Sequence, residues 1–215
     1  MVEMRKKILA ISLILSSFFF FTGLFIGKTL AELSIGEIIR QTNELRNTML
    51  SIEVASQLAE KGECNKAMLD ELGREISKIG KELERLETEV GYKNRKVLEL
   101  KEYYNLLLIR YYLLSQKVKE RCGFNYSFIL FFYSNKDEYR ERCLEQGRYL
   151  DYVVYRLGNR NVKIFAIEGE LINSTAITTL KEMYNVSSYP TLVINGKKVM
   201  KGVIYPERIL QEIQR

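Results

Sequence analysis

Twenty consecutive residues near the start of the chain, Ile8 to Gly27, carry no charge. At ~1.5 Å per residue, a helix of this length crosses the ~30 Å hydrocarbon core of a bilayer. Arg5, Lys6 and Lys7 precede the run, and cations before a span favour a cytoplasmic N-terminus. We therefore expect a single-pass protein of the cell membrane that spans it with residues 8–27 and has the rest of the chain on the extracytoplasmic side.

Two features of this segment leave alternatives open. Thr29, Leu30 and Ala31 would suit cleavage of a signal peptide, but the uncharged run exceeds the ~7 to 15 residues of a usual signal core, which favours an uncleaved anchor. Gly23 and Gly27 form a G-x-x-x-G pair, which lets two spans approach closely and allows a homodimer.

Three helices are predicted between residues 34 and 121, a segment without proline. The first is expected to open at the capping-box pattern from Ser34 to Glu37 and to end near Gly62. The second and third carry apolar or tyrosine residues at alternating spacings of three and four: Leu69, Leu72, Ile76, Ile79, Leu83, Leu86 and Val90, then Val97, Leu100, Tyr104, Leu107, Tyr111, Leu114 and Val118. Only residues 91–94 separate these two, which predicts an antiparallel pair. We interpret residues 34–121 as a three-helix coiled-coil stalk, with residues 1–33 as the transmembrane anchor.

The cysteines give a geometric prediction. Helices that run up, down and up place Cys64 and Cys122 at the same end, so the two can form a disulfide, which would persist outside the cytoplasm. Cys143 follows a strand and part of a helix, and lies near the opposite end of its domain. It is expected to be a free thiol.

Composition excludes several classes of site. The chain has no histidine and only three cysteines, whose spacing fits no zinc site, so we expect no metal and no cofactor. The net charge is +6, but the basic segment follows an acidic one that can pair with it inside the molecule. Nucleic acid is therefore not an expected partner.

Residues 122–215 are predicted to form one α/β domain of the order β-α-β-α-β-β-α. Apolar runs, caps and turn residues assign strands to 128–134, 162–167, 191–194 and 198–203, and helices to 137–157, 174–184 and from Pro206 onward. Asn195 and Gly196 supply the tight turn between the last two strands.

Specific residues of this segment resemble the thioredoxin-like superfamily, in its membrane-anchored archaeal type. They are Cys143, Gln146 and Gly147 in the helix after the first strand, then Pro190, Asn195 and Gly196. The resemblance covers about residues 124–215. It implies a cis Tyr189–Pro190 bond beside a degenerate C-x-x-C motif, in which Cys143 is the second cysteine and Arg140 stands in place of the first.

Thiol–disulfide exchange needs an exposed thiolate and a second thiol nearby. With Asn135 as the expected N-cap, Cys143 lies about two turns inside its helix, where the dipole no longer favours a thiolate. The predicted function is a binding or scaffold module for extracytoplasmic proteins or peptides, with Tyr189, Pro190 and Arg140 as binding residues. The alternative is a thiol–disulfide oxidoreductase or isomerase that uses Cys143 alone, with Arg140 and Arg142 lowering the thiol pKa.

Overall fold

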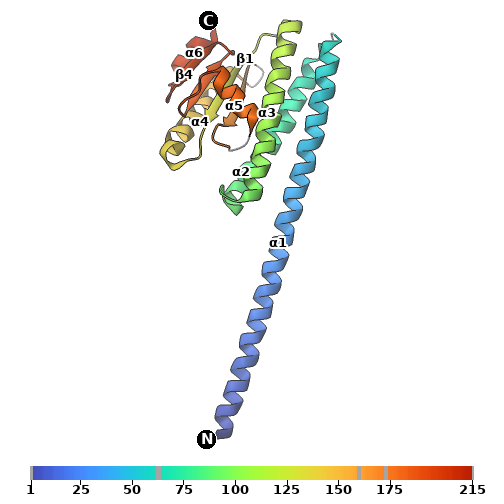
Figure 1. Cartoon of the computed structure of the whole chain (residues 1–215), viewed down its shortest axis with the longest axis vertical. Coiled ribbons are helices and arrows are strands. Elements are labelled where there is room, and N and C mark those ends of the chain that lie inside the picture. The colour runs from blue at the N-terminus through green and yellow to red at the C-terminus, as the bar shows by residue number, and fades with distance from the viewer. Residues whose placement is uncertain (1, 62–63, 159–160, 172–173, 215) are drawn as a thin grey trace. The chain divides into compact units, whose positions relative to one another are not determined.

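The computed structural model describes residues 2–61, 64–158, 161–171 and 174–214, and only the backbone of residues 2–10, 29–39, 41 and 42 (Figure 1). The chain divides into two compact units, Met1–Thr42 and Asn43–Arg215. The divisions expected from the sequence lay at residues 33 and 121.

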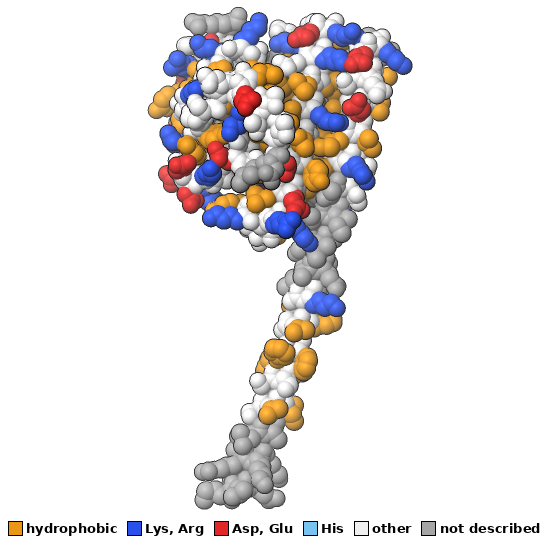
Figure 2. Space-filling model, in the orientation of Figure 1, with side chains coloured by type: hydrophobic (Ala, Val, Ile, Leu, Met, Phe, Trp, Pro, Cys, Tyr) orange, Lys and Arg blue, Asp and Glu red, His pale blue; other side chains and the backbone are white. Residues whose placement is uncertain are grey.

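The first unit is the N-terminal part of one long helix, α1 (Val2–Glu60). Its segment Ile11–Lys28 is long and apolar enough to cross a membrane. Phe18, Phe19, Phe20 and Phe21 are 64–67% exposed, so this helix is not a core helix of the domain, and Figure 2 shows hydrophobic side chains along it. The expected helix start at Ser34 is wrong, because the backbone is helical on both sides of that residue and leaves no free amides there to cap.

The second unit contains the end of α1 and all the other elements. The helices are α2 (Lys66–Val90), α3 (Arg95–Cys122), α4 (Asp137–Leu157), α5 (Thr175–Met183) and α6 (Pro206–Gln214), and the strands are β1 (Ser127–Tyr133), β2 (Val162–Glu168), β3 (Thr191–Ile194) and β4 (Lys198–Lys201).

Helices α2 and α3 form an antiparallel hairpin in which tyrosines of α3 lie over glycines of α2. Tyr111 packs on Gly73, and Tyr104, one heptad earlier, packs on Gly80, one heptad later. The two helices therefore run in opposite directions. The Tyr111 hydroxyl also donates a hydrogen bond of 2.7 Å to the Leu69 carbonyl, which fixes the register.

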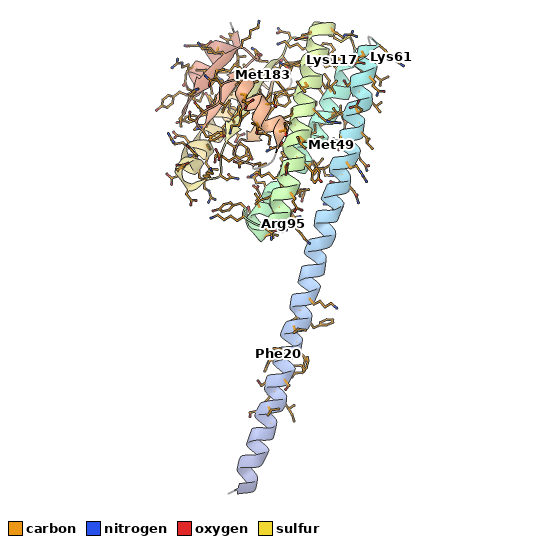
Figure 3. All side chains as sticks on the ribbon, viewed as in Figure 1. Phe20, Met49, Lys61, Arg95, Lys117 and Met183 are labelled. Carbon is orange, nitrogen blue, oxygen red and sulfur yellow. A yellow bond between two sulfur atoms is a disulfide. The ribbon has the colours of Figure 1, made fainter. Side chains whose placement is uncertain are left out.

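The Cys64–Cys122 disulfide is confirmed, with 5.6 Å between the Cα atoms and a sequence separation of 58. Arg121 reinforces the same end by donating a 2.9 Å hydrogen bond to the Ala59 carbonyl of α1. Figure 3 shows Lys61 and Lys117 toward this end of the helices and Arg95 toward the other. Cys143 is free, as predicted.

The sheet has the strand order β2-β1-β3-β4, with β1 parallel to β2 and the other neighbours antiparallel. Helices α3 and α5 pack on one face, where the Tyr112 ring meets Phe128 and Phe165 edge-on. Helices α4 and α6 pack together on the other. The prediction of a mixed α/β domain is confirmed.

Two details differ from the sequence prediction. Strand β4 ends at Lys201, where Gly202 takes a left-handed φ of 84°, although the Gly202 amide still donates to the carbonyl of Pro190, the next residue in the β3–β4 register, at 2.8 Å. Helix α3 is part of the second unit because it packs on β2 as well as on α2.

Candidate functional site

A pocket lies where the carboxyl ends of the parallel strands β1 and β2 meet the start of α4. In α/β folds this edge is where ligands usually bind. The pocket holds about 310 Å³ and is bounded by the α2–α3 turn, the β1–α4 loop and the segment after β2. Its lining residues are Tyr92, Lys93, Leu98, Lys101, Asn135, Lys136, Asp137, Glu168, Glu170 and Leu171.

The floor of the pocket is a buried ionic cluster around Lys101 of α3. The Lys101 ammonium lies 2.6 Å from Oε1 of Glu87 and 3.4 Å from Oε2 of Glu168, and only 4% of its side chain is exposed. It also stands 5.3 Å from the centre of the Tyr133 ring. One cation thus balances two carboxylates from α2 and β2 inside the domain.

Glu168 is held by polar contacts on both its main chain and its side chain. The Asn105 amide accepts from the Glu168 N–H at 3.5 Å and donates to its carbonyl at 3.3 Å, while the Asn135 N–H donates to the carboxylate at 3.2 Å. Burial raises the pKa of Glu168 above its ordinary 4.5, although Lys101 works in the opposite direction. The carboxylate is thus positioned beneath the start of α4.

Helix α4 begins at Asp137 with Lys136 at the N-cap, not with a capping side chain of Asn135 as predicted. The Ser134 hydroxyl instead accepts a hydrogen bond of 3.1 Å from the Lys136 amide. The main-chain N–H of Asn135 donates to the Glu168 carboxylate. The Lys136 ammonium pairs with Glu170 across the pocket.

Cys143 lies on the buried face of α4 with 6% of its surface exposed. Burial raises the pKa of its thiol; a hydrogen bond to the Ser134 main chain and the charge of Arg142 lower it, and the Glu168 carboxylate raises it further. The expected lowering by nearby arginines is therefore outweighed. A thiol in this setting is a poor nucleophile at neutral pH.

Arg140, which the resemblance puts at the place of the first motif cysteine, is exposed and lies with its guanidinium 5.4 Å from the centre of the Tyr92 ring. A cation over an aromatic face is an attractive contact. Arg140 therefore joins the start of α4 to the α2–α3 turn at the rim of the pocket.

The Tyr189–Pro190 peptide bond is cis, and Tyr189 itself is 4% exposed. The Tyr189 hydroxyl donates a hydrogen bond of 2.9 Å to the Gly169 carbonyl, and its ring meets Tyr139 edge-on at 5.4 Å. The structure therefore places Tyr189 beneath the surface and Arg140 on it. Of the two, only Arg140 is free to touch a partner in this conformation.

No protein-family model matches the sequence, and a comparison with curated proteins finds no match. Five chains match among solved structures. One belongs to the crystal structure of chloroplastic thioredoxin z, described as defining a novel type-specific target recognition. It is 19% identical, with a TM-score of 0.35, over 46% of this chain and 86% of that one.

Sequence reasoning missed the buried cluster of Lys101, Glu87 and Glu168. One signal for it was present, because Glu168 closes an apolar strand at the sheet edge where functional side chains gather. Lys101 carried no such signal, since a lysine next to a helical seam usually faces solvent. Tyr92 had been assigned only to a connecting turn.

Proposed function

We propose that this protein is a single-pass membrane protein whose thioredoxin-like domain lies outside the cytoplasm and binds proteins or peptides there without dithiol exchange. One observation carries the proposal: the only free thiol, Cys143, is buried, and the neighbouring position that the family resemblance gives to an attacking cysteine is Arg140. In this proposal the domain has the fold of a thiol–disulfide exchange protein but lacks the pair of reactive cysteines.

The chemistry of thiol exchange supports this reading. A mixed disulfide must be resolved by a second thiol, and the other two cysteines are joined to each other at the far end of α3. The alternative function, an oxidoreductase or isomerase that uses Cys143 alone, would require a partner disulfide to reach a sulfur that is 6% exposed and whose pKa is raised.

The pocket rim offers the surface for binding. Arg140 and Tyr92 form a cation–aromatic contact there, and Lys93 is exposed beside them on the α2–α3 turn. Aromatic and guanidinium groups are the side chains that most often anchor protein partners. An extracytoplasmic location is supported by the Cys64–Cys122 disulfide, because such bonds persist in oxidising compartments.

Reduction of insulin disulfides by the full chain in detergent micelles tests the redox half of the proposal. We expect wild type and Cys143→Ser to give the same rate as dithiothreitol alone, because no accessible thiolate is present. Turnover in the wild type that Cys143→Ser abolishes would establish the oxidoreductase instead.

Photo-cross-linking in the native membrane tests the binding half. A photoreactive amino acid is placed at Arg140, and a matched one at Arg208, which is exposed on α6. We expect position 140 to give a discrete set of cross-linked extracytoplasmic proteins that position 208 does not give. Equal, diffuse labelling at both positions would count against a binding surface at the rim.

A further inference from the structure

Strand β2 has an open edge. It is an outer strand of the sheet, and β1 is its partner on the inner side. The Ser127 amide donates to the Asn161 carbonyl and the Gly169 amide to the Tyr133 carbonyl, each at 2.9 Å. These two bonds fix which residues of β2 pair with β1. In a parallel ladder with this register, the main-chain N–H and C=O groups of residues 163, 165 and 167 point toward β1, and those of residues 162, 164, 166 and 168 point outward.

The last of these outward residues is already paired. The Asn105 side chain of α3 binds both the N–H and the carbonyl of Glu168, as a neighbouring strand would. Ile164 and Ala166, both half-buried, present the same two groups with no main-chain partner among the described residues, whereas Val162 is 2% exposed. An edge of this kind is a template for another strand.

The open edge lies in a groove of about 960 Å³. Residues of α2 form one wall: Asp70, Gly73, Arg74, Ser77, Lys78, Lys81 and Glu84. Residues of α4 form the other: Gly147, Leu150, Asp151 and Val154. Because helices flank the edge on both sides, a single extended chain fits it, whereas the edge of a second folded sheet would meet α2 and α4.

The two walls differ chemically. Toward α4 the lining is mostly apolar, with Leu150, Val154 and Phe131 beside the half-buried Ile164, and it includes the exposed carboxylate of Asp151. Toward α2, Lys78 and Lys81 are exposed and make no ion pair within the described residues. Glu84 is an exposed carboxylate on the same wall, and Asp70 is paired with Lys163 at 3.1 Å. Alternate side chains of an added strand would therefore meet apolar groups and lysine ammonium groups in turn.

We infer that the open edge of β2 binds an extended peptide of a partner protein as an added strand, and that this peptide alternates apolar and acidic side chains. The site is separate from the pocket rim and does not depend on the function proposed there. Residues 164 and 166 supply two donors and two acceptors to the peptide backbone.

A synthetic seven-residue peptide of alternating valine and glutamate is the probe, with the full chain in detergent micelles and binding followed by fluorescence anisotropy. A second peptide, N-methylated at alternate amides, keeps every side chain but loses donors on one edge. We expect it to bind about tenfold more weakly, because it forfeits about two hydrogen bonds. Equal affinity of the two peptides would overturn strand addition.

Charge reversal tests the α2 wall. We expect the variant Lys78→Glu/Lys81→Glu to raise the dissociation constant about fivefold or more, with the largest effect at low salt. Lys198→Glu, an exposed lysine on the opposite outer strand β4, is the matched control and should leave the constant unchanged. An equal effect of both changes would mean non-specific attraction and would contradict the assignment.

Hydrogen exchange locates the peptide directly. The amides of Ile164 and Ala166 should exchange quickly in the free protein and slow at least tenfold with saturating peptide. Ile164→Pro removes one outward donor without touching the β1 ladder, and should weaken binding while leaving the unfolding midpoint close to wild type. Protection elsewhere but not at residues 162–166 would refute the inference. Protection of these residues without peptide, increasing with protein concentration, would also refute it, because it would indicate pairing between copies of the chain.

Discussion

Lys101 is a buried cation that forms ion pairs with two carboxylates, those of Glu87 and Glu168. Replacing it by methionine leaves Glu87 and Glu168 facing each other without a cation. We expect Lys101→Met to lower the free energy of unfolding by about 3 kcal/mol or more, measured by urea titration. Arg95→Met, which breaks the exposed pair with Glu99, should change it little. Similar losses in the two variants would contradict a buried cluster.

Glu168 makes stability depend on pH in a defined direction. Its pKa is raised above the ordinary 4.5 in the folded protein, chiefly by burial, so between the two values the folded state holds more protons than the unfolded state. The contribution of Glu168 is therefore fully present below 4.5 and is lost as the pH rises through the folded pKa. The difference in unfolding free energy between wild type and Glu168→Gln should fall from about pH 4 toward about pH 8. A difference that stays flat or grows over this range would rule the assignment out.

The α2–α3 hairpin depends on glycine for its close approach. A β-carbon at Gly73 would lie 2.6 Å from the Tyr111 hydroxyl, which is itself anchored to Leu69. Gly73→Ala should therefore cost about 1–3 kcal/mol by urea unfolding, although alanine is the better helix former. Gly147→Ala is the matched control, since nothing lies within 4 Å of its β-carbon, and it should stabilise α4 by up to ~1 kcal/mol. Stabilisation by both changes would show that the Tyr111 side chain moves aside to accommodate the β-carbon.

One face of helix α3 could be predicted from the sequence and another could not. Its heptad seam was visible and correctly paired it with α2, because apolar spacing within one helix is a local signal. A second buried stripe of Lys101, Asn105, Leu108, Tyr112 and Ser115 faces the sheet side, and it was not predicted. Three of its five members are polar, and their burial depends on partners such as Glu168 that are remote in sequence. The candidate site was predicted only in part for the same reason. Cys143 and Arg140 belong to a sequence pattern that resembles C-x-x-C, whereas Lys101 and Tyr92 join the site only through tertiary contacts.

In the second unit the disulfide closes a loop that contains α2 and α3. It closes a separation of 58 residues, so its loss frees the unfolded state more than it alters the folded one. Cys64→Ser/Cys122→Ser should lower the free energy of unfolding by about 4 kcal/mol by loop-closure theory. Cys143→Ser, which removes a buried thiol that is not in a disulfide, is the control and should have a smaller effect. Equal losses would mean that the bond adds nothing beyond the packing of the cysteines.

The proposed function places the second unit outside the cytoplasm, and the charges before the apolar helix test that placement. Arg5, Lys6 and Lys7 precede the apolar segment Ile11–Lys28, so the positive-inside rule predicts that residues 43–215 lie outside. In spheroplasts of a bacterial host, externally added protease should digest a C-terminal tag on the wild-type chain. Arg5→Glu/Lys6→Glu/Lys7→Glu should increase the protected fraction, because the charge bias that retains the N-terminus in the cytoplasm is gone. Protection of the wild-type tag, with the chain still in the membrane after alkaline carbonate, would reverse the orientation and place both the pocket rim and the β2 edge in the cytoplasm.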